Sequence, residues 1–322
     1  MRRRTVVISV SVVVVLLALG IFVYSFTNIG RPSDTCPPTL VGSGYASEGP
    51  MPFRIEAIGS QVGVITGTAQ FHGYSGSGVI TWCIFDNSGL LKGSLQTDRI
   101  MGQVAASADG QYVAVAGFEI APGPAGRYTN GAVYLFDKSG TTKWEIASAS
   151  PIFSIGINDN GSVIVANDQE LLYLNGGGRV LWNYSKFASM TAALIDDGSR
   201  VVAGVNGFSN PGGSYYGSAL IMFDAHGHPL WNVSIPEGTF DSGSSLAVTN
   251  GLIAAGVSTS GVSGTLLCFN LQGSAIWSRH IDSAILNVNF EANGSTILAV
   301  TNWGQVSFNT SGNVIENQTS PH

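Results

Sequence analysis

The sequence predicts an all-β protein, a single β-propeller of about six four-stranded blades preceded by one N-terminal transmembrane helix. Three features lead to this prediction: a tight turn that recurs along the chain, a tryptophan at a fixed distance behind four of these turns, and an uncharged apolar run near the N-terminus. A repeat period of roughly 40–50 residues is typical of propellers and solenoids.

The recurring turn has Phe or Leu first, Asp or Asn second and Gly fifth. Its copies start at Phe85, Phe136, Leu174, Phe223, Phe269 and Phe308. Eight residues after the first position, the four inner copies have Trp144, Trp182, Trp231 and Trp277, whereas the outer two have Gly93 and Glu316. Terminal repeats are commonly atypical. The predicted units are 53–97, 98–148, 149–186, 187–237, 238–281 and 282–319.

Each unit divides into four short strands with a second turn between the first and second strands. These turns contain Asp109-Gly110, Asn160-Gly161, Asp197-Gly198, Asn250-Gly251 and Asn293-Gly294. Asp-Gly and Asn-Gly pairs favour type I′ hairpins, in which both central residues have positive φ. Strands such as 113–116 and 163–166 are small or β-branched on both faces, which suits sheets that are buried on both sides.

Before the repeats, three arginines at positions 2–4 precede 21 uncharged apolar residues, Val6 to Phe26. This run is long enough to span a bilayer, and the positive-inside rule places the arginines in the cytoplasm. We therefore expect a cytoplasmic tail (1–5), a transmembrane anchor (6–26), a Pro/Gly/Ser-rich stalk (27–52) and an extracytoplasmic propeller (53–319). The alternative is a cleaved signal peptide whose apolar region is Val6–Leu17.

Composition narrows the class of partner. Charged residues make up 11% of the chain and the net charge is −6, which argues against a nucleic-acid partner because phosphate binding needs a concentrated basic patch. The three cysteines, Cys36, Cys83 and Cys268, allow either one disulfide with one free thiol or three buried thiols.

Six Asn-x-Ser/Thr sequons follow the apolar run, at Asn160, Asn183, Asn232, Asn293, Asn309 and Asn317. They indicate either a glycosylated exterior or only the abundance of Asn and Ser in turns.

The segment Gly131-Ala132-Val133-Tyr134-Leu135-Phe136-Asp137-Lys138-Ser139-Gly140-x-x-x-Trp144 resembles the repeat of the pyrroloquinoline-quinone-like (PQQ-like) propeller family. The resemblance extends over nearly all of residues 53–319. It implies that the four repeat tryptophans dock between neighbouring blades, which is a structural role. It also implies a scaffold function without a cofactor, because envelope assembly factors use this fold without PQQ.

Connections between second and third strands emerge together on one face of a propeller, and loops on a rigid scaffold commonly bind partners. Longer connections are expected at Ala69–Gly78, Phe118–Asn130 and Asn206–Gly217, and a polar one at Ser258–Gly264. The candidate residues for binding a protein partner or a surface glycan are Phe71, His72, Tyr74, Arg127, Tyr128, Phe208, Tyr215 and Tyr216.

The function predicted from these features is a non-catalytic binding or assembly scaffold at the cell envelope. No catalytic or phosphate-binding motif is present, so no catalytic residue, metal or cofactor is predicted. His226 and His228 beside Asp224 could bind a metal, but they lie in a turn on the opposite face. One alternative is a glycan-binding or glycan-cleaving propeller with Tyr128, Tyr215 and Tyr216 as sugar platforms. Another is a PQQ-dependent dehydrogenase, which the lack of adjacent cysteines and of a calcium-binding carboxylate set disfavours.

Overall fold

The computed structural model describes the backbone of residues 13–17, 20–24, 51–58, 61–67, 71–72, 75–76, 80–86, 91–97, 100–120, 128–186, 188–207, 217–236, 238–240, 245–249, 251–259, 262–291 and 294–318. Side chains are described within these ranges from residue 103 onward, except at 120, 128, 188–190 and 196.

The described residues form six four-stranded antiparallel sheets. The first contains β3 (Met51–Ile58), β4 (Gln61–Gly67), β7 (Ile80–Asp86) and β8 (Leu91–Thr97). The second contains β9 (Ile100–Ala106), β10 (Tyr112–Ile120), β11 (Tyr128–Asp137) and β12 (Thr142–Ser148). The third contains β13 (Ile152–Ile157), β14 (Val163–Asn167), β15 (Leu171–Leu174) and β16 (Val180–Tyr184).

The remaining three sheets repeat this order of strands. The fourth contains β17 (Ala188–Ile195), β18 (Arg200–Asn206), β19 (Ser218–Asp224) and β20 (Pro229–Ile235). The fifth contains β21 (Leu246–Val248), β22 (Leu252–Thr259), β23 (Ser263–Asn270) and β24 (Ala275–Ile281). The sixth contains β25 (Ile285–Phe290), β26 (Thr296–Thr301), β27 (Gly304–Asn309) and β28 (Val314–Asn317). A 3-10 turn, η1, covers Asp196–Gly198.

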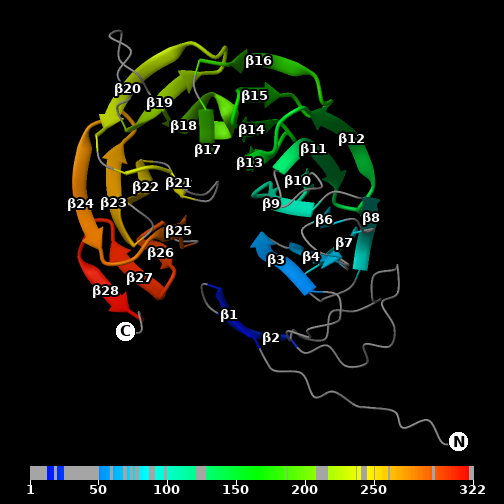
Figure 1. The fold of residues 1–322 in the computed structure, drawn as a ribbon, viewed down its shortest axis with the longest axis horizontal. Coiled ribbons are helices and arrows are strands. Elements are labelled where there is room, and N and C mark those ends of the chain that lie inside the picture. The colour runs from blue at the N-terminus through cyan, green and yellow to red at the C-terminus, as the bar shows by residue number, and fades with distance from the viewer. Residues whose placement is uncertain are drawn as a thin grey trace, which may run out of the picture.

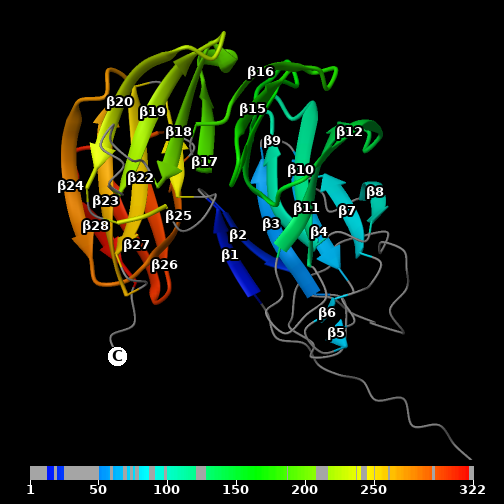
Figure 2. The same cartoon turned by 45° about the horizontal axis from the view of Figure 1, so that its top comes forward.

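The sheets follow one another around a central axis, with the first strand of each innermost and the fourth outermost (Figure 1). Consecutive inner strands contact one another, β9 with β13, β13 with β17, β17 with β21 and β21 with β25. Figure 2 shows that each sheet turns its face toward the next one in the series. The predicted all-β propeller architecture is therefore confirmed.

The core lies between adjacent sheets rather than at the centre of the ring. Between the third and fourth sheets, for example, Ile164 packs in one buried cluster with Val201 and Phe223. All five residues of β14 are buried, because the second strand of each blade is covered on both faces. Residues without polar side chains on either face satisfy this requirement, which explains the uninterrupted apolar pattern of these strands.

The hairpins between first and second strands differ from the expected type I′ turns. Gly110 and Gly161 have φ of 68° and 76°, but within the described chain only Asn130 and Asp197 are non-glycine residues with positive φ. Only the glycine is therefore left-handed in these two turns, as in three- and four-residue hairpin loops. The Asp197-Gly198 pair does have positive φ at both residues, 55° and 88°.

Two predicted connections are shorter than expected because strand pairing continues into them. In the second sheet, Glu119 pairs with Thr129 and Ile120 with Tyr128, beyond a register shift after Phe118. In the fifth sheet, Ser258 pairs with Gly264 and Thr259 with Ser263. Ladder hydrogen bonds satisfy backbone groups that an irregular loop would leave to solvent.

The N-terminal segment also differs from expectation. Within 6–26, the structure describes β1 (Val13–Leu17) paired with β2 (Gly20–Tyr24), which Figure 1 places between the first and last sheets of the series. Valine and isoleucine are abundant in this run, and β-branched residues favour strands outside a lipid environment. Among the described residues, no helix is long and apolar enough to cross a membrane. The transmembrane helix stays a prediction from the sequence.

Candidate functional site

The turn between third and fourth strands is built around its second residue, an Asp or Asn. In the second blade, Asp137 Oδ1 accepts hydrogen bonds from the backbone N–H groups of Ser139 and Thr141, at 2.8 and 3.2 Å. The same two bonds recur at Asn175, Asp224, Asn270 and Asn309. Asp and Asn are therefore interchangeable here because the turn requires only the side-chain oxygen.

Each of the four repeat tryptophans contacts the corresponding turn of the next blade. The indole Nε1–H donates to the backbone carbonyl of the third turn residue. The four pairs are Trp144 to Gly176 (3.1 Å), Trp182 to Ala225 (3.0 Å), Trp231 to Leu271 (3.0 Å) and Trp277 to Thr310 (2.8 Å). One indole therefore bridges each of the four successive junctions from the second blade to the sixth.

The fifth residue of the turn is glycine for two physical reasons. In the turn of the fourth blade, Gly227 has φ of 82°, a left-handed conformation that a side chain makes unfavourable. A Cβ atom at Gly227 would also lie 2.7 Å from Cδ2 of Trp182. The corresponding glycines 178, 273 and 312 are equally close to the preceding blade's indole. These turns thus form the structural framework of one face of the propeller.

The histidine pair considered as a metal site lies on this framework face. Asp224 Oδ1 already accepts two backbone hydrogen bonds, and its Oδ2 lies 3.1 Å from Nδ1 of His228. The pKa of the Asp224 carboxyl is lowered, chiefly by the hydrogen bond from the backbone N–H of His228. The His228 side chain and the His226 N–H add to this effect, and burial opposes it. Within the described residues, no three His, Cys, Asp or Glu side chains are placed to hold a metal ion.

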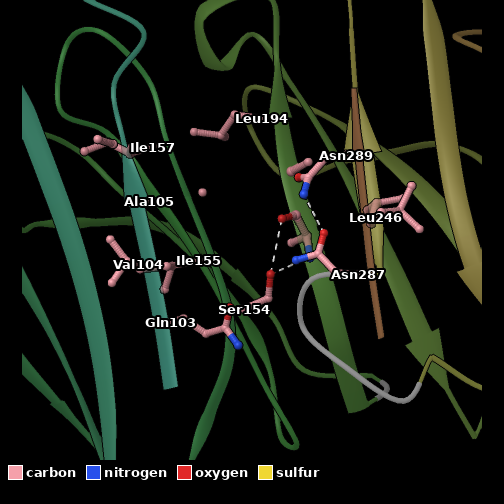
Figure 3. A pocket seen from close by; sticks show the side chains of 15 residues that line it. Gln103, Val104, Ala105, Ser154, Ile155, Ile157, Leu194, Leu246, Asn287 and Asn289 are labelled. Atoms are coloured by element: carbon pink, nitrogen blue, oxygen red, sulfur yellow. Dashed lines mark hydrogen bonds between the residues drawn. The ribbon is translucent and has the colours of Figure 1, made fainter. Parts of the chain in front are cut away.

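The central channel forms a cavity of about 260 Å³ between the inner strands of the second to sixth blades. Its described lining is neutral: amides and a hydroxyl from Gln103, Ser154, Asn287 and Asn289 lie among backbone and apolar side chains, including Leu194 and Leu246 (Figure 3). The volume is slightly below the roughly 300 Å³ at which drug-sized ligand pockets begin.

The polar groups of the channel are engaged within the fold. Ser154 Oγ accepts from the N–H of Ala192 at 3.2 Å and lies 3.4 Å from its carbonyl. Asn289 Nδ2 donates to Asn287 Oδ1 at 2.6 Å (Figure 3). The described part of the lining does not fit a PQQ–calcium pair, because calcium sites rely on several carboxylates and none of the described lining residues is Asp or Glu. Among the lining residues whose side chains are described, none is an Asp, Glu, His, Lys, Arg or Cys.

The structure describes none of the eight predicted partner-binding side chains. Phe71 and His72 form β5, which pairs with β6 (Ser75–Gly76), and Tyr128 begins β11, but their side chains are not described. Tyr74, Arg127, Phe208, Tyr215 and Tyr216 lie wholly outside the described residues. Their role in binding stays a prediction.

The sequence analysis missed one exposed aromatic residue on the face where second strands connect to third strands. Trp303 lies in the connection between β26 and β27, and its side chain is 43% exposed. Its backbone N–H donates to Thr301 Oγ1 at 3.2 Å, which fixes the turn. Its spacing could have revealed it, because Trp303 does not follow a repeat turn by eight residues and so is no blade-docking tryptophan.

These observations define the class of protein: a β-propeller of PQQ-like repeats, with a channel whose described lining is neutral. The family model described as outer membrane protein assembly factor BamB matches residues 75–308, and the chain belongs to this PQQ-like repeat family.

Two solved structures are similar to this chain, and the first of them supports the fold. The crystal structure of BamB from Moraxella catarrhalis is similar with a TM-score of 0.50 and 16% identity, over 82% of this chain and 71% of that one. A protein of unknown function from Bacteroides caccae is similar with a TM-score of 0.43 and 14% identity, over 59% of this chain and 69% of that one. No curated protein matches the sequence.

Proposed function

We propose that this chain is a membrane-anchored, extracytoplasmic β-propeller that acts as a non-catalytic binding or assembly scaffold at the cell envelope. Residues 6–26 anchor it, 27–52 form the stalk and 53–319 form the propeller. The observation that carries the proposal is the family match over residues 75–308, to a model described as an outer membrane protein assembly factor.

The chemistry of the described surfaces supports a scaffold over an enzyme. The described lining of the channel consists of amides, a hydroxyl and apolar groups, and none of these described groups titrates in the range that general acid–base catalysis uses. The turns on one face have their side-chain oxygens, carbonyls and glycines engaged in blade structure. The opposite face carries the variable connections and the exposed Trp303, and aromatic residues are enriched at protein interfaces.

The test is recovery of a partner by the full-length chain. A C-terminally tagged protein is crosslinked in its native membranes, solubilised in mild detergent and purified, and co-purified proteins are quantified by mass spectrometry. We expect one envelope protein at a fixed ratio, lost when residues 121–127 or 208–216 are replaced by short glycine linkers and reduced by Trp303→Ser.

The matched control is His226→Ser, which alters an exposed side chain on the opposite face and should leave recovery unchanged. Loss of the partner in His226→Ser but not in the loop variants would contradict the proposed binding face. A tightly bound small molecule that turns over, with no envelope protein recovered, would overturn the scaffold function itself.

A further inference from the structure

Asn183 and Asn232 occupy equivalent places on neighbouring blades. Each lies one residue after a docking tryptophan, on the outermost strand of its sheet, β16 or β20. Both asparagines are exposed, as are the serines that complete their sequons, Ser185 and Ser234. In both sequons, the asparagine and the serine are therefore exposed to solvent on the outermost strand of the blade.

An exposed leucine precedes each of these asparagines by two positions. Leu181 is 50% exposed and Leu230 is 53% exposed. Each leucine is the extra residue at a register shift of its strand, Leu181 between Val180 and Trp182 and Leu230 between Pro229 and Trp231. A bulged residue is left unpaired in the ladder, so each leucine is an exposed apolar side chain two positions along the chain from a sequon asparagine. Exposed apolar residues on an outer strand invite edge-to-edge association, and proteins normally protect such edges. The sixth blade repeats the pair as Ile315 and Asn317, both exposed.

We propose that Asn183 and Asn232 carry N-linked glycans, and that each glycan covers the leucine two residues before it. A glycan is bulky and solubilising, so at these positions it would protect the outer strand in the way that charged residues do in other sheets. The inference rests on the extracytoplasmic location proposed above.

Contacts within the fold are compatible with modification at these positions. Asn183 Nδ2 donates to Glu170 Oε2 at 3.3 Å. A glycan replaces one of the two hydrogens on Nδ2, so the remaining N–H can keep this hydrogen bond.

Other described sequons are placed less favourably. Asn160 lies in a tight turn, and its sequon partner Ser162 is buried at 6% exposure and donates its hydroxyl to Asn160 Oδ1 at 2.6 Å. Asn309 is half-buried, and its Oδ1 caps the turn that Trp277 contacts. The structure therefore distinguishes the two outer-strand sequons from sequons that are part of turns.

The test is site-resolved glycopeptide mass spectrometry on the full-length protein from its native cells. Trypsin releases residues 180–186, a peptide that contains Asn183 as its one sequon asparagine, and chymotrypsin separates the Asn232 site from the others. We expect glycan mass on both peptides and none on the Asn160 peptide. Ser185→Ala and Ser234→Ala keep the asparagine and remove the sequon, so each should lower the intact mass by one glycan.

The shielding role has its own readout and control. Loss of a glycan in Ser185→Ala should raise the fluorescence of a dye that binds exposed apolar surface, and adding Leu181→Ser should reverse that rise. Ser278→Ala, at the corresponding place on β24 where there is no sequon, should change neither mass nor dye binding. Occupied sites with unchanged dye binding would refute the shielding.

Membrane-impermeant labelling of the propeller in intact cells separates the two proposals. A labelled, external propeller with unmodified Asn183 and Asn232 peptides overturns this inference and leaves the scaffold function standing. An unlabelled propeller on the cytoplasmic side overturns both.

Discussion

The junction between the third and fourth blades predicts a large effect from one methyl group, Gly227→Ala. A left-handed residue with a side chain costs about 1–2 kcal/mol relative to glycine, and Gly227 has φ of 82°. The added Cβ would lie 2.7 Å from the Trp182 ring, and overpacking of this kind costs about 1–3 kcal/mol. The substitution should therefore destabilise the protein by about 2–5 kcal/mol.

The assay is thermal and urea unfolding of the detergent-solubilised full chain, followed by tryptophan fluorescence and near-UV circular dichroism. At about 2–4 °C per kcal/mol for a domain of this size class, the midpoint should fall by roughly 5–15 °C. Gly251→Ala is the matched control, because Gly251 is exposed, lacks a positive φ and has no atom within 4 Å of an added Cβ. Its effect should stay within about 0.5 kcal/mol.

A double-mutant cycle assigns the cause. In a Trp182→Leu background the ring atoms that the new Cβ would meet are removed, so Gly227→Ala should cost only the backbone share, about 1–2 kcal/mol. Equal midpoints for Gly227→Ala and Gly251→Ala would refute the argument. An undiminished cost in the Trp182→Leu background would refute the steric part of it.

Three further predictions follow from individual contacts. The hydrogen bond from the Ser139 hydroxyl is the main cause of a lowered pKa at the Asp137 carboxyl; backbone N–H groups add to the effect and burial opposes it. The ionised carboxylate therefore stabilises the fold above the unfolded pKa near 3.9, and this stabilisation is lost as pH falls through the lower folded pKa. Asp137→Asn should reduce the loss of stability at acid pH, measured by urea unfolding at a series of pH values. Asp137→Ala should lower the free energy of unfolding by about 1 kcal/mol at pH 7. Burial raises the pKa of Cys268 to about 11, so peptide mapping after maleimide treatment at pH 8 should find Cys268 unlabelled in the native protein and labelled after unfolding. Asn158, which is buried and donates to the Asp197 carbonyl of the next blade at 2.6 Å, should cost about 1–3 kcal/mol when changed to Ala, measured by urea unfolding.

The sequence predicted the repeat architecture because backbone geometry determines its marker residues. An Asx oxygen that accepts two N–H groups and a glycine with positive φ leave few substitutions possible, as at Asp137 and Gly140. The buried state of Cys268 was one of two alternatives that composition left open. Such local requirements can be read from one chain because they act within a few residues.

Features that depend on longer-range pairing were not predictable in the same way. The extension of β10 to Ile120 and of β11 back to Tyr128 follows from a register shift that no turn residue signals. The exposure of Trp303 depends on how the sixth blade packs rather than on its own neighbours in the chain. In the hairpin at Asn160 only Gly161 is left-handed. The backbone hydrogen bond from Asn158 N–H to the Ser162 carbonyl closes a loop of three residues rather than the two that the Asn-Gly pair favours.

The same contacts explain why one face of the propeller has a structural role and the other is available for binding. On one face, every described third-to-fourth strand turn combines an Asx cap with, from the third blade onward, an indole from the preceding blade. A substitution in one of these turns therefore affects the stability of the fold more directly than it affects the binding of a partner. In the tight third and sixth blades, Glu170 and Asn302 of the connections on the other face bond to Asn183 and Ala284 of their own blades, whereas the four docking indoles all contact turns on the opposite face. These connections can therefore vary in length and sequence without loss of the fold, which is the physical reason to seek the partner on the face of Trp303.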